Sequence, residues 1–339
     1  MQALLVNAHR GPVDEKNLAI SILLIACVVV GCASEPAPLK TWEHSTSGLF
    51  EAAVSNDGNF AVVSSFNEGT SFWDLEKNKR LFDWRHQQSG ENNIGLAVFS
   101  TNDSHVLTAD SRTFVIWSTV NGEALGYWAV EADILDAALS DDAKHILLGL
   151  KDGRALHINR LTGRRLEVIA HRSEWVTSLA MSHDGKTVAT GGNDKRVMVW
   201  DAESGDELGV FEHTHRVVKV AFDRAGKQIL TADENSNAFI WSLRSNKLIS
   251  TLKLKRDELH VVEARFSASG DRLLLGFPGR NIGLWSTKSG KRLQRWVTPT
   301  RKFGWVPQGS TVYAVAFAGN EKAIVAQSSN GLGGKYKIL

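Results

Sequence analysis

The chain has 339 residues, with 39 Lys and Arg residues against 37 Asp and Glu residues and a formal net charge of +2 at pH 7. This balance gives no reason to expect a nucleic-acid partner, because proteins that bind nucleic acid usually carry a strong basic excess on one face. Both cysteines, Cys27 and Cys32, lie in one apolar N-terminal segment. The rest of the chain would therefore tolerate an oxidising compartment without requiring one.

The first element in chain order is an apolar run at residues 18–30, LAISILLIACVVV. Its 13 residues match the roughly 7 to 15 of a signal-peptide core better than the roughly 20 of a membrane-spanning helix. The run ends in Val29-Val30-Gly31-Cys32, which resembles the lipobox of bacterial lipoproteins. This resemblance implies that residues 1–31 are a signal peptide and that Cys32 carries a diacylglycerol lipid, with acyl chains such as palmitate, at the mature N-terminus.

Alternatives stay open for this segment. Leu24-Ile25-Ala26-Cys27 fits the same pattern, although cleavage before Cys27 would expose three valines. The run could also be an uncleaved signal anchor, or an ordinary helix with two buried cysteines. Two acidic residues just before the run depart from the positive charge of a signal peptide. A start at Val13 would give a more ordinary leader, so residues 1–12 need not belong to the natural product.

Residues 32–38 are the expected tether, which is polar and contains Pro36 and Pro38. Two or more acyl chains would give stable membrane attachment. Ala33, rather than Asp, follows the cysteine, and resemblance to sorted lipoproteins then favours the outer membrane. The sequence therefore predicts a membrane-anchored lipoprotein that faces the periplasm.

A repeating unit fills residues 39–339. One marker is a large apolar residue three positions after a Leu or Ile, at Trp42, Trp84, Trp128, Ile169, Phe211, Leu252 and Trp296, with successive differences of 42, 44, 41, 42, 41 and 44. A second marker, at Trp73, Trp117, Ile158, Trp200, Trp241 and Trp285, has differences of 44, 41, 42, 41 and 44. A period in this range, with several short strands per unit, is typical of a β-propeller blade.

Residues 217–222 alternate between the two faces of a strand, and turn sequences such as Asn56-Asp57-Gly58 and Asp184-Gly185 separate the strands. Units such as MSHDGKTVATGGNDKRVMVWDAESG at 181–205 resemble those of the WD-repeat family. Seven units predict an all-β, seven-bladed propeller over residues 39–339. The repeat region starts with an outer strand that has no blade before it, and its last unit is shorter than the others. The N-terminal strand is therefore expected to pair with the C-terminal blade and close the ring.

In the WD-repeat family, a His, a Ser or Thr, an Asp and a Trp of one blade form a hydrogen-bonded structural network. By this resemblance, blade four alone carries the whole set, as His171, Thr190, Asp194 and Trp200. Blade five has His213, Thr231 and Trp241 with Asn235 at the place of the Asp, and blade one has His44, Ser64 and Trp73. These histidines are expected to serve the fold, because one orphaned buried polar group costs about 1 to 3 kcal/mol.

No motif for catalysis or cofactor binding stands out. His213 and His215 would share one face of a strand and could offer two metal ligands, but no third ligand is near them in sequence. The glycine-rich stretch at 330–335 lacks the Ser or Thr and the helix of a phosphate-binding loop, so it is expected to be a turn. The sequence predicts no catalytic residue, no metal and no cofactor.

The connection between Trp296 and Val312 is about ten residues longer than the shorter joints between blades, and long loops often carry function. Phe303 and Trp305, flanked by Arg301 and Lys302, are therefore predicted to bind a partner. By family resemblance, Trp175 in the joint before blade four would share their face. The alternative is that the two aromatic side chains fold back to cover the propeller.

These features predict a non-catalytic, membrane-tethered scaffold of the bacterial cell envelope that binds one or more envelope proteins. One alternative is a propeller enzyme, a lyase or hydrolase with its site in the central channel, and another is an envelope ligand sensor. A polar channel with clustered carboxylates and histidines would favour the enzyme. An apolar rim at Trp305 would favour the scaffold.

Overall fold

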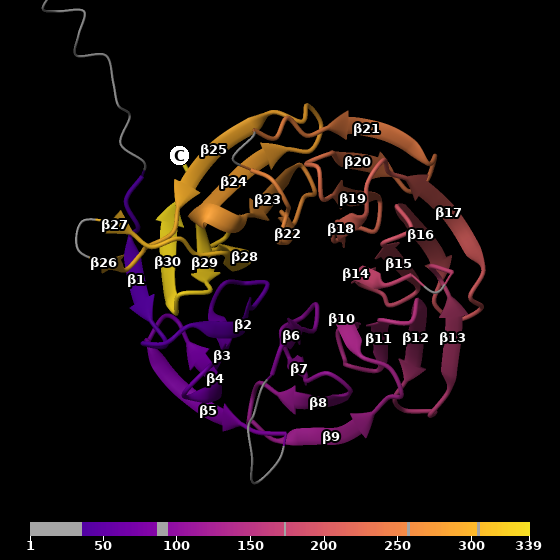
Figure 1. Cartoon of the computed structure of the whole chain (residues 1–339), viewed down its shortest axis with the longest axis horizontal. Coiled ribbons are helices and arrows are strands. Elements are labelled where there is room, and N and C mark those ends of the chain that lie inside the picture. Colours follow the sequence, from indigo (N-terminus) through magenta and orange to yellow (C-terminus); the bar gives the residue numbers. More distant parts are fainter. Residues whose placement is uncertain (1–35, 87–93, 173, 256–257, 304–305) are drawn as a thin grey trace, which may run out of the picture. The chain divides into compact units, whose positions relative to one another are not determined.

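The computed structural model describes residues 36–86, 94–172, 174–255, 258–303 and 306–339, with the backbone alone at 302, 303, 306 and 307. The predicted signal peptide and Cys32 lie outside these residues. Residues 36–339 form a unit of their own, built from seven four-stranded antiparallel sheets that are arranged in a ring (Figure 1). The innermost strands line a central channel. The prediction of an all-β, seven-bladed propeller is confirmed.

Blades one to three follow the chain, and the first strand of each is the innermost (Figure 1). Blade one consists of β2 (Leu49–Val54), β3 (Phe60–Ser65), β4 (Gly69–Asp74) and β5 (Lys79–Trp84). Blade two consists of β6 (Leu96–Phe99), β7 (His105–Ala109), β8 (Thr113–Ser118) and β9 (Ala124–Ala129). Blade three consists of β10 (Ile134–Leu139), β11 (His145–Leu150), β12 (Arg154–Asn159) and β13 (Arg165–Ile169).

Blades four to six repeat this order. Blade four consists of β14 (Val176–Met181), β15 (Thr187–Gly192), β16 (Arg196–Asp201) and β17 (Glu207–Glu212). Blade five consists of β18 (Val217–Phe222), β19 (Gln228–Asp233), β20 (Ala238–Ser242) and β21 (Lys247–Thr251). Blade six consists of β22 (Glu263–Phe266), β23 (Arg272–Gly276), β24 (Asn281–Ser286) and β25 (Arg292–Val297), with a short 3-10 helix, η1 (Pro278–Arg280), before β24.

Blade seven joins the two ends of the propeller. It contains β28 (Val312–Ala318), β29 (Ala323–Ser328) and β30 (Leu332–Lys337), and its outermost strand is β1 (Lys40–Glu43). β1 pairs antiparallel with β30, so that Trp42 lies opposite Gly333. The Trp42 indole N–H also donates to the carbonyl oxygen of Leu75 in blade one, at 2.8 Å. The predicted closure of the ring is therefore confirmed, and β1 fastens the last blade to the first.

The hydrophobic core lies between neighbouring blades. Leu230 and Ile240 of blade five, for example, share one buried cluster with Leu273 and Trp285 of blade six. Fully burying a side chain of this size contributes roughly 1.5 to 3 kcal/mol. Because the blades are held together by these contacts, the channel surface of the inner strands is free to carry polar residues.

The turns and the helical content agree with the repeat pattern. Asn56-Asp57-Gly58 connects β2 to β3, where Gly58 has a φ of 71° that other residues adopt only with strain. Asp184-Gly185 connects β14 to β15 in the same way. In the part of the chain that the structure describes, no helix has the length and apolar character needed to span a bilayer.

Candidate functional site

The inner strands of all seven blades line a cavity of about 800 Å³ in the central channel. In five of these strands, β2, β10, β14, β18 and β28, the pairing register shifts by one residue near the start. Such a bulge bends the strand and redirects the side chains beside it. The residues that follow the shift all line the cavity: Glu51, Asp136, Ser178, Lys219 and Ala314.

Charged side chains gather where these strands begin. The ammonium of Lys219 lies 2.5 Å from one oxygen of the Glu263 carboxylate. The guanidinium of Arg265 lies 3.5 Å from the other. The side chains of Lys219 and Glu263 remain 19% and 18% exposed, because they face the cavity and not a closed core. Two cations are thus directed at one carboxylate.

Glu51 and Asp136 have different partners. One oxygen of Glu51 accepts the backbone N–H of Ala52 at 2.8 Å, and one oxygen of Asp136 accepts the backbone N–H of Leu179 at 2.7 Å. No Lys or Arg nitrogen of the described residues forms an ion pair with either carboxyl. Burial raises the pKa of Glu51 to about 8 and also raises the pKa of Asp136. At pH 7 the Glu51 carboxyl is therefore mostly protonated.

The channel has one of the features that would favour the enzyme alternative over the scaffold. It is polar and holds clustered carboxylates, as the enzyme alternative requires. Among the described residues that line the cavity, His183 is the one histidine. It pairs with Asp141 at 3.2 Å, whereas the ion pairs of Glu263 are with Lys219 and Arg265. Trp305 lies outside the described residues, so its rim remains a prediction.

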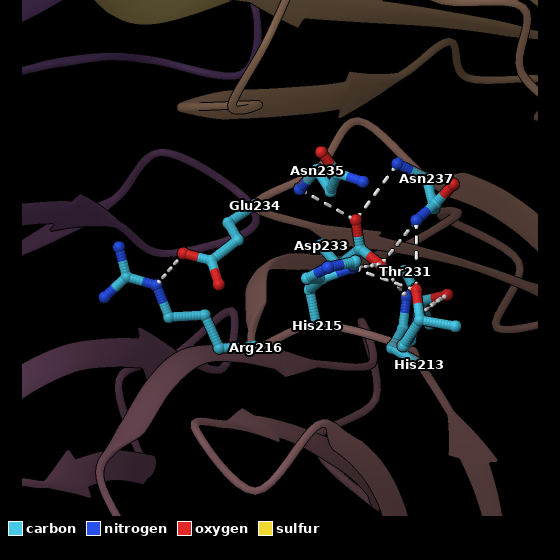
Figure 2. A network of polar contacts seen from close by, with 9 residues as sticks. His213, His215, Arg216, Thr231, Asp233, Glu234, Asn235 and Asn237 are labelled. Atoms are coloured by element: carbon cyan, nitrogen blue, oxygen red, sulfur yellow. Dashed lines mark hydrogen bonds and ion pairs between the residues drawn. The ribbon is translucent and has the colours of Figure 1, made fainter.

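A second set of polar contacts runs through blade five. Figure 2 shows His213 between Thr231 and Asp233. The Trp241 indole N–H donates to the Thr231 hydroxyl at 2.8 Å, and that hydroxyl lies 2.8 Å from Nε2 of His213. Nδ1 of His213 lies 3.3 Å from the Asp233 carboxylate. Because an indole can only donate, the bonds run in one direction from Trp241 through Thr231 and His213 to Asp233.

Asp233, and not Asn235, therefore takes the place of the family's Asp in blade five, which corrects the sequence assignment. The Asp233 carboxylate accepts the backbone N–H groups of Asn235 and Asn237, each at 3.0 Å, and the side-chain amide of Asn237 at 2.9 Å (Figure 2). Although burial opposes them, these bonds lower the pKa of Asp233. Burial lowers the pKa of His213, so the imidazole is neutral at pH 7. The network is part of the fold.

Blade two contains an equivalent network that sequence reasoning missed. His86 Nε2 lies 2.8 Å from the Thr108 hydroxyl, which accepts the Trp117 indole N–H at 2.7 Å. Asp110 lies 3.8 Å from Nδ1 of His86, whose nearer contact is the Thr113 hydroxyl at 3.2 Å. The shared signal is the tripeptide Thr-Ala-Asp, at 108–110 and again at 231–233. In both blades it places the carboxylate two residues after the threonine.

Blade four is the less complete case, contrary to the prediction that it alone carries the set. Nδ1 of His171 lies 2.8 Å from the Asp194 carboxylate. Nε2 of His171, the Thr190 hydroxyl and the Trp200 indole N–H are buried without a hydrogen-bond partner among the described residues. Here Asp194 follows Thr190 by four positions. The set is present in sequence but only its His–Asp bond is formed.

The expected set of blade one is also corrected. His44 Nδ1 contacts the side-chain oxygen of Gln327 at 3.0 Å, because β1 belongs to the sheet of blade seven. The Ser64 hydroxyl instead accepts a bond from Thr70 at 3.3 Å. The Trp73 indole N–H donates to Ser71 at 2.8 Å. Trp73 remains in ring contact with His44, with centroids 4.7 Å apart.

The described residues contain no group of three or more His, Cys, Asp or Glu side chains that could hold a metal ion. Of the two histidines considered as ligands, His213 is engaged by Thr231 and Asp233, and His215 lies 3.0 Å from the Thr214 hydroxyl. Another histidine pair lies in blade three, where Nδ1 of His145 is 3.0 Å from Nε2 of His157. The glycine-rich stretch at 330–335 forms a turn and the start of β30.

The long joint before blade seven contains an additional hairpin, β26 (Lys302–Phe303) and β27 (Val306–Pro307), which lies outside the ring beside β1 (Figure 1). Arg301 at its base donates to the carbonyl oxygen of Ser45 at 2.7 Å and pairs with Glu43 at 2.8 Å. The side chains of Lys302 and Phe303, like Trp305, lie outside the description. Arg301 thus fixes the hairpin to the residues around β1.

Trp175, the remaining predicted contact residue, is 44% exposed, and the Lys151 ammonium lies 5.3 Å from its ring centroid. It precedes β14, which Figure 1 places across the channel from the hairpin. Trp175 and the hairpin both lie in joints that lead from an outer strand to the inner strand of the next blade, and their sharing of one binding face stays a prediction.

Residues 163–201, which span most of blade four, match the family model "WD domain, G-beta repeat". The chain is 21% identical over 225 residues to Autophagy-related protein 16 of Arabidopsis thaliana, covering 63% of this chain and 43% of that protein. It is 24% identical over 198 residues to WD repeat-containing protein SL1-17 of Schistosoma mansoni, covering 56% and 64%. These matches support a WD-repeat propeller. It is 29% identical over 204 residues to the 66 kDa stress protein of Physarum polycephalum, covering 58% of this chain and 32% of that protein. The chain therefore spans less than two thirds of the length of each of these three relatives.

Proposed function

We propose that this chain is a non-catalytic protein-binding scaffold of the bacterial cell envelope, held at a membrane by a lipid on Cys32. The observation that carries the proposal is the extra hairpin β26–β27, which no other joint of the described chain contains. Relatives such as WD repeat-containing protein SL1-17 match this chain, and a β-propeller offers a rigid frame for loops that contact other proteins.

The hairpin is built to keep a fixed position. The backbone N–H of Gln308 donates to the carbonyl oxygen of Arg301 at 2.9 Å across its base. Asn330 donates its side-chain amide to the carbonyl oxygen of Pro299 at 3.2 Å. A loop that is held in place before binding loses less conformational entropy on association than a free loop does. Its sequence places Phe303 and Trp305 between these anchors, and such residues are enriched at interfaces.

Affinity capture from envelope extracts tests this contact. The variant carrying Phe303→Ala and Trp305→Ala should lose a partner that the unmodified chain retains. The matched control is Tyr127→Ala on β9, whose side chain is 59% exposed on the outside of blade two. It should retain that partner. If the hairpin variant still captures every protein that the control captures, the hairpin is not the docking site.

The membrane tether rests on the apolar run at residues 18–30 and the lipobox-like ending at Cys32. Intact mass of the protein from its own membrane fraction tests it. A mature chain that begins at Cys32 with added acyl mass, and that is lost in Cys32→Ser, is expected. Recovery in the outer-membrane fraction would support the predicted location. An unlipidated chain that retains its N-terminal run would replace the lipoprotein with a signal-anchored propeller.

The second candidate is a propeller enzyme, a lyase or hydrolase, and the carboxylates of the channel favour it. A carboxyl with a pKa near 8, such as that of Glu51, can act as a general acid at neutral pH. Chromogenic ester, glycoside and phosphate substrates should then be turned over by the unmodified chain and not by Glu51→Gln. Equal background rates for both proteins would remove this candidate.

A further inference from the structure

The charge of the chain is divided unevenly between two parts of the ring. Residues 235–339, from the β19–β20 turn of blade five to the end of blade seven, contain 17 Lys and Arg residues but 5 Asp and Glu residues. Residues 1–234 contain 22 and 32, so a formal charge of +12 in one part is offset by −10 in the other. Such an asymmetry points to an anionic surface as the partner of the basic part.

The exposed cations of this part gather on a surface that we call the basic rim. It is defined by six exposed side chains: Arg244, Lys247, Lys288, Lys291, Lys322 and Lys337. They lie on the turn between β20 and β21, on the turn between β24 and β25, and where β29 begins and β30 ends. None of the six forms an ion pair with a carboxyl group of the described residues. Their charge is therefore available to a partner.

Contacts between neighbouring blades join these turns. The Ser250 hydroxyl of β21 donates to the carbonyl oxygen of Thr287, in the basic turn of blade six, at 2.5 Å. Gln294 of β25 donates its side-chain amide to the carbonyl oxygen of Lys337 at 3.3 Å. The backbone N–H of the residue after Lys337 donates to the carbonyl oxygen of Lys322 at 3.0 Å. The rim is thus one surface over three consecutive blades, five, six and seven (Figure 1).

Apolar side chains lie exposed between the cations. Leu248 and Ile249 of β21 are 48% and 39% exposed, and Leu293 of β25 is 54% exposed. Ile249 and Leu293 are the extra residues where the pairing register of the two outer strands shifts, so the backbone bulges at both. Basic side chains mixed with exposed apolar ones are typical of surfaces that lie in a membrane interface.

Protection of sheet edges does not account for the rim. β21 and β25 are edge strands, and charged side chains on an edge discourage pairing with another chain. Charge of either sign serves this purpose, and the corresponding turn of blade four carries Glu203 and Asp206. Edge protection also gives no reason for exposed leucines. A single sign of charge together with apolar side chains indicates an anionic partner.

The N-terminal residues leave the propeller beside the rim. The Leu39 backbone N–H donates to the carbonyl oxygen of Lys335 at 2.7 Å. Because β1 is antiparallel to β30, the chain before Leu39 continues toward the end of β30 that carries Lys337. The proposed lipid on Cys32 is four residues before Pro36, and four residues reach at most about 14 Å. Such an anchor would hold a bilayer near the rim and not near the far side of the ring.

We infer that the basic rim is a docking surface for the head groups of an anionic phospholipid bilayer. The cations pair with the lipid phosphates, and the exposed apolar side chains of β21 and β25 enter the boundary between head groups and acyl chains. The inference rests on the proposed membrane tether and adds an orientation to it.

This orientation leaves the hairpin accessible. Arg301 fixes the β26–β27 hairpin at the Glu43 end of β1, whereas the rim begins beyond the Lys40 end of the same strand. A propeller that rests on its rim therefore directs the hairpin away from the bilayer, where a protein partner can reach it.

Lysine labelling on vesicles tests the inference. The full chain is inserted from detergent into preformed vesicles of phosphatidylcholine, or of equal parts of phosphatidylcholine and phosphatidylglycerol. A water-soluble amine reagent then labels exposed lysines, and mass spectrometry measures the rate at each one. We expect labelling of Lys288, Lys291 and Lys337 to be about fivefold slower on the anionic vesicles, the factor that corresponds to roughly 1 kcal/mol for one Lys at such a surface. Lys186 and Lys195, which are exposed on blade four, should be labelled equally on both.

Salt and charge reversal sharpen the test. About 1 M salt should abolish the difference between the vesicles, because the Debye length then falls to about 3 Å. The variant with Lys288→Glu and Lys291→Glu should lose the protection of Lys337. Its matched control, Lys186→Glu with Lys195→Glu, changes the charge by the same amount at exposed positions of blade four and should retain that protection.

The outcomes separate the rim from the tether. Attachment to phosphatidylcholine vesicles reports the N-terminal anchor, whereas the difference between the vesicles reports the rim. Attachment to both with equal labelling would overturn the rim and leave the tether in place. Protection on anionic vesicles without attachment to phosphatidylcholine would support the rim and overturn the tether. Equal protection by soluble polyglutamate would assign the rim to an acidic protein, and the bilayer inference would be wrong.

Discussion

The polar network of blade five and the charged cluster of the channel use buried polar groups in opposite ways. In blade five, Trp241, Thr231, His213 and Asp233 form a directed series in which each donor meets an acceptor. In the channel, the carboxyl of Glu51 is largely shielded from bulk water and receives only one backbone N–H. A satisfied network stabilises a fold, whereas an incompletely satisfied group keeps its capacity for a ligand. This difference distinguishes the blade five network, which serves the fold, from the channel cluster, which is a candidate binding site.

The largest effect should come from Glu51→Gln at alkaline pH. The unfolded carboxyl has a pKa of about 4.3, and the folded one has a pKa of about 8. Between these values the folded state holds a proton that the unfolded state has released. The stability of the unmodified chain therefore falls as pH rises, by at most roughly 1.4 kcal/mol per pH unit. Gln carries no such proton, so the variant should gain stability over the unmodified chain, by up to roughly 4 kcal/mol from pH 5 to pH 8.

Urea unfolding at pH 5, 6, 7 and 8 measures this difference. The estimate is an upper limit, because Glu51 retains contact with the water of the cavity. Glu131→Gln, at an exposed position, should follow the unmodified chain at every pH. Parallel pH profiles for Glu51→Gln and the unmodified chain would show that Glu51 titrates normally, and the contrast with blade five would then fail.

The next effect in size is a loss of stability in Thr231→Val, which preserves the shape of the side chain and removes its hydroxyl. It leaves Nε2 of His213 and the indole N–H of Trp241 without partners, and the expected cost is about 2 to 3 kcal/mol. Thr190→Val in blade four is the matched control, because that buried hydroxyl has no partner among the described residues. Its cost should stay below about 1 kcal/mol. Equal losses in the two variants, by urea unfolding at pH 7, would contradict the distinction between the blades.

The fold could be predicted from the sequence because its evidence is repeated. Two apolar markers keep one period across the chain, and the surplus strand at Lys40–Glu43 indicated how the ring closes. The composition of each network was harder to predict. Asp110 and Asp233 reach their histidines from a position two residues earlier than Asp194 does, so a fixed spacing misses them. Only the Thr-Ala-Asp repetition carries that information.

The channel cluster could not be predicted from any single motif, because its members are far apart in sequence. Glu51, Asp136, Lys219 and Glu263 occupy one equivalent position near the start of different inner strands. Each looks like an ordinary surface charge within its own repeat. The closed ring turns these positions toward one another. Aligning the repeats and comparing that single position across blades would have revealed the cluster.

The smallest effect is expected where the β26–β27 hairpin meets the residues around β1, a contact that we call the seam. Its polar groups are paired but only partly buried. Arg301→Ala removes the pairing with Glu43 and the bond to the carbonyl oxygen of Ser45, and these side chains are partly exposed. The expected cost is about 1 kcal/mol, because solvent screens the ion pair while the bond to the backbone is directional. The matched control is Arg164→Ala, which likewise pairs with a glutamate, Glu203, and donates to a backbone carbonyl oxygen, that of Glu203 at 2.8 Å. Because these two side chains are 55% and 87% exposed, solvent weakens both bonds, and the cost should be less than about 0.5 kcal/mol.

Thermal unfolding of Arg301→Ala and Arg164→Ala measures their stability costs, which can then be compared with the costs of Thr231→Val and Thr190→Val. If Arg301→Ala costs as little as Arg164→Ala, the hairpin rests on the seam without stabilising it, and Arg301 is then free to contact a partner, as the sequence alone suggested. If it costs several kcal/mol, the seam resembles the blade five network, and the hairpin contributes to ring closure itself. A loss near 1 kcal/mol supports the intermediate role, in which Arg301 positions the hairpin at little expense to the ring.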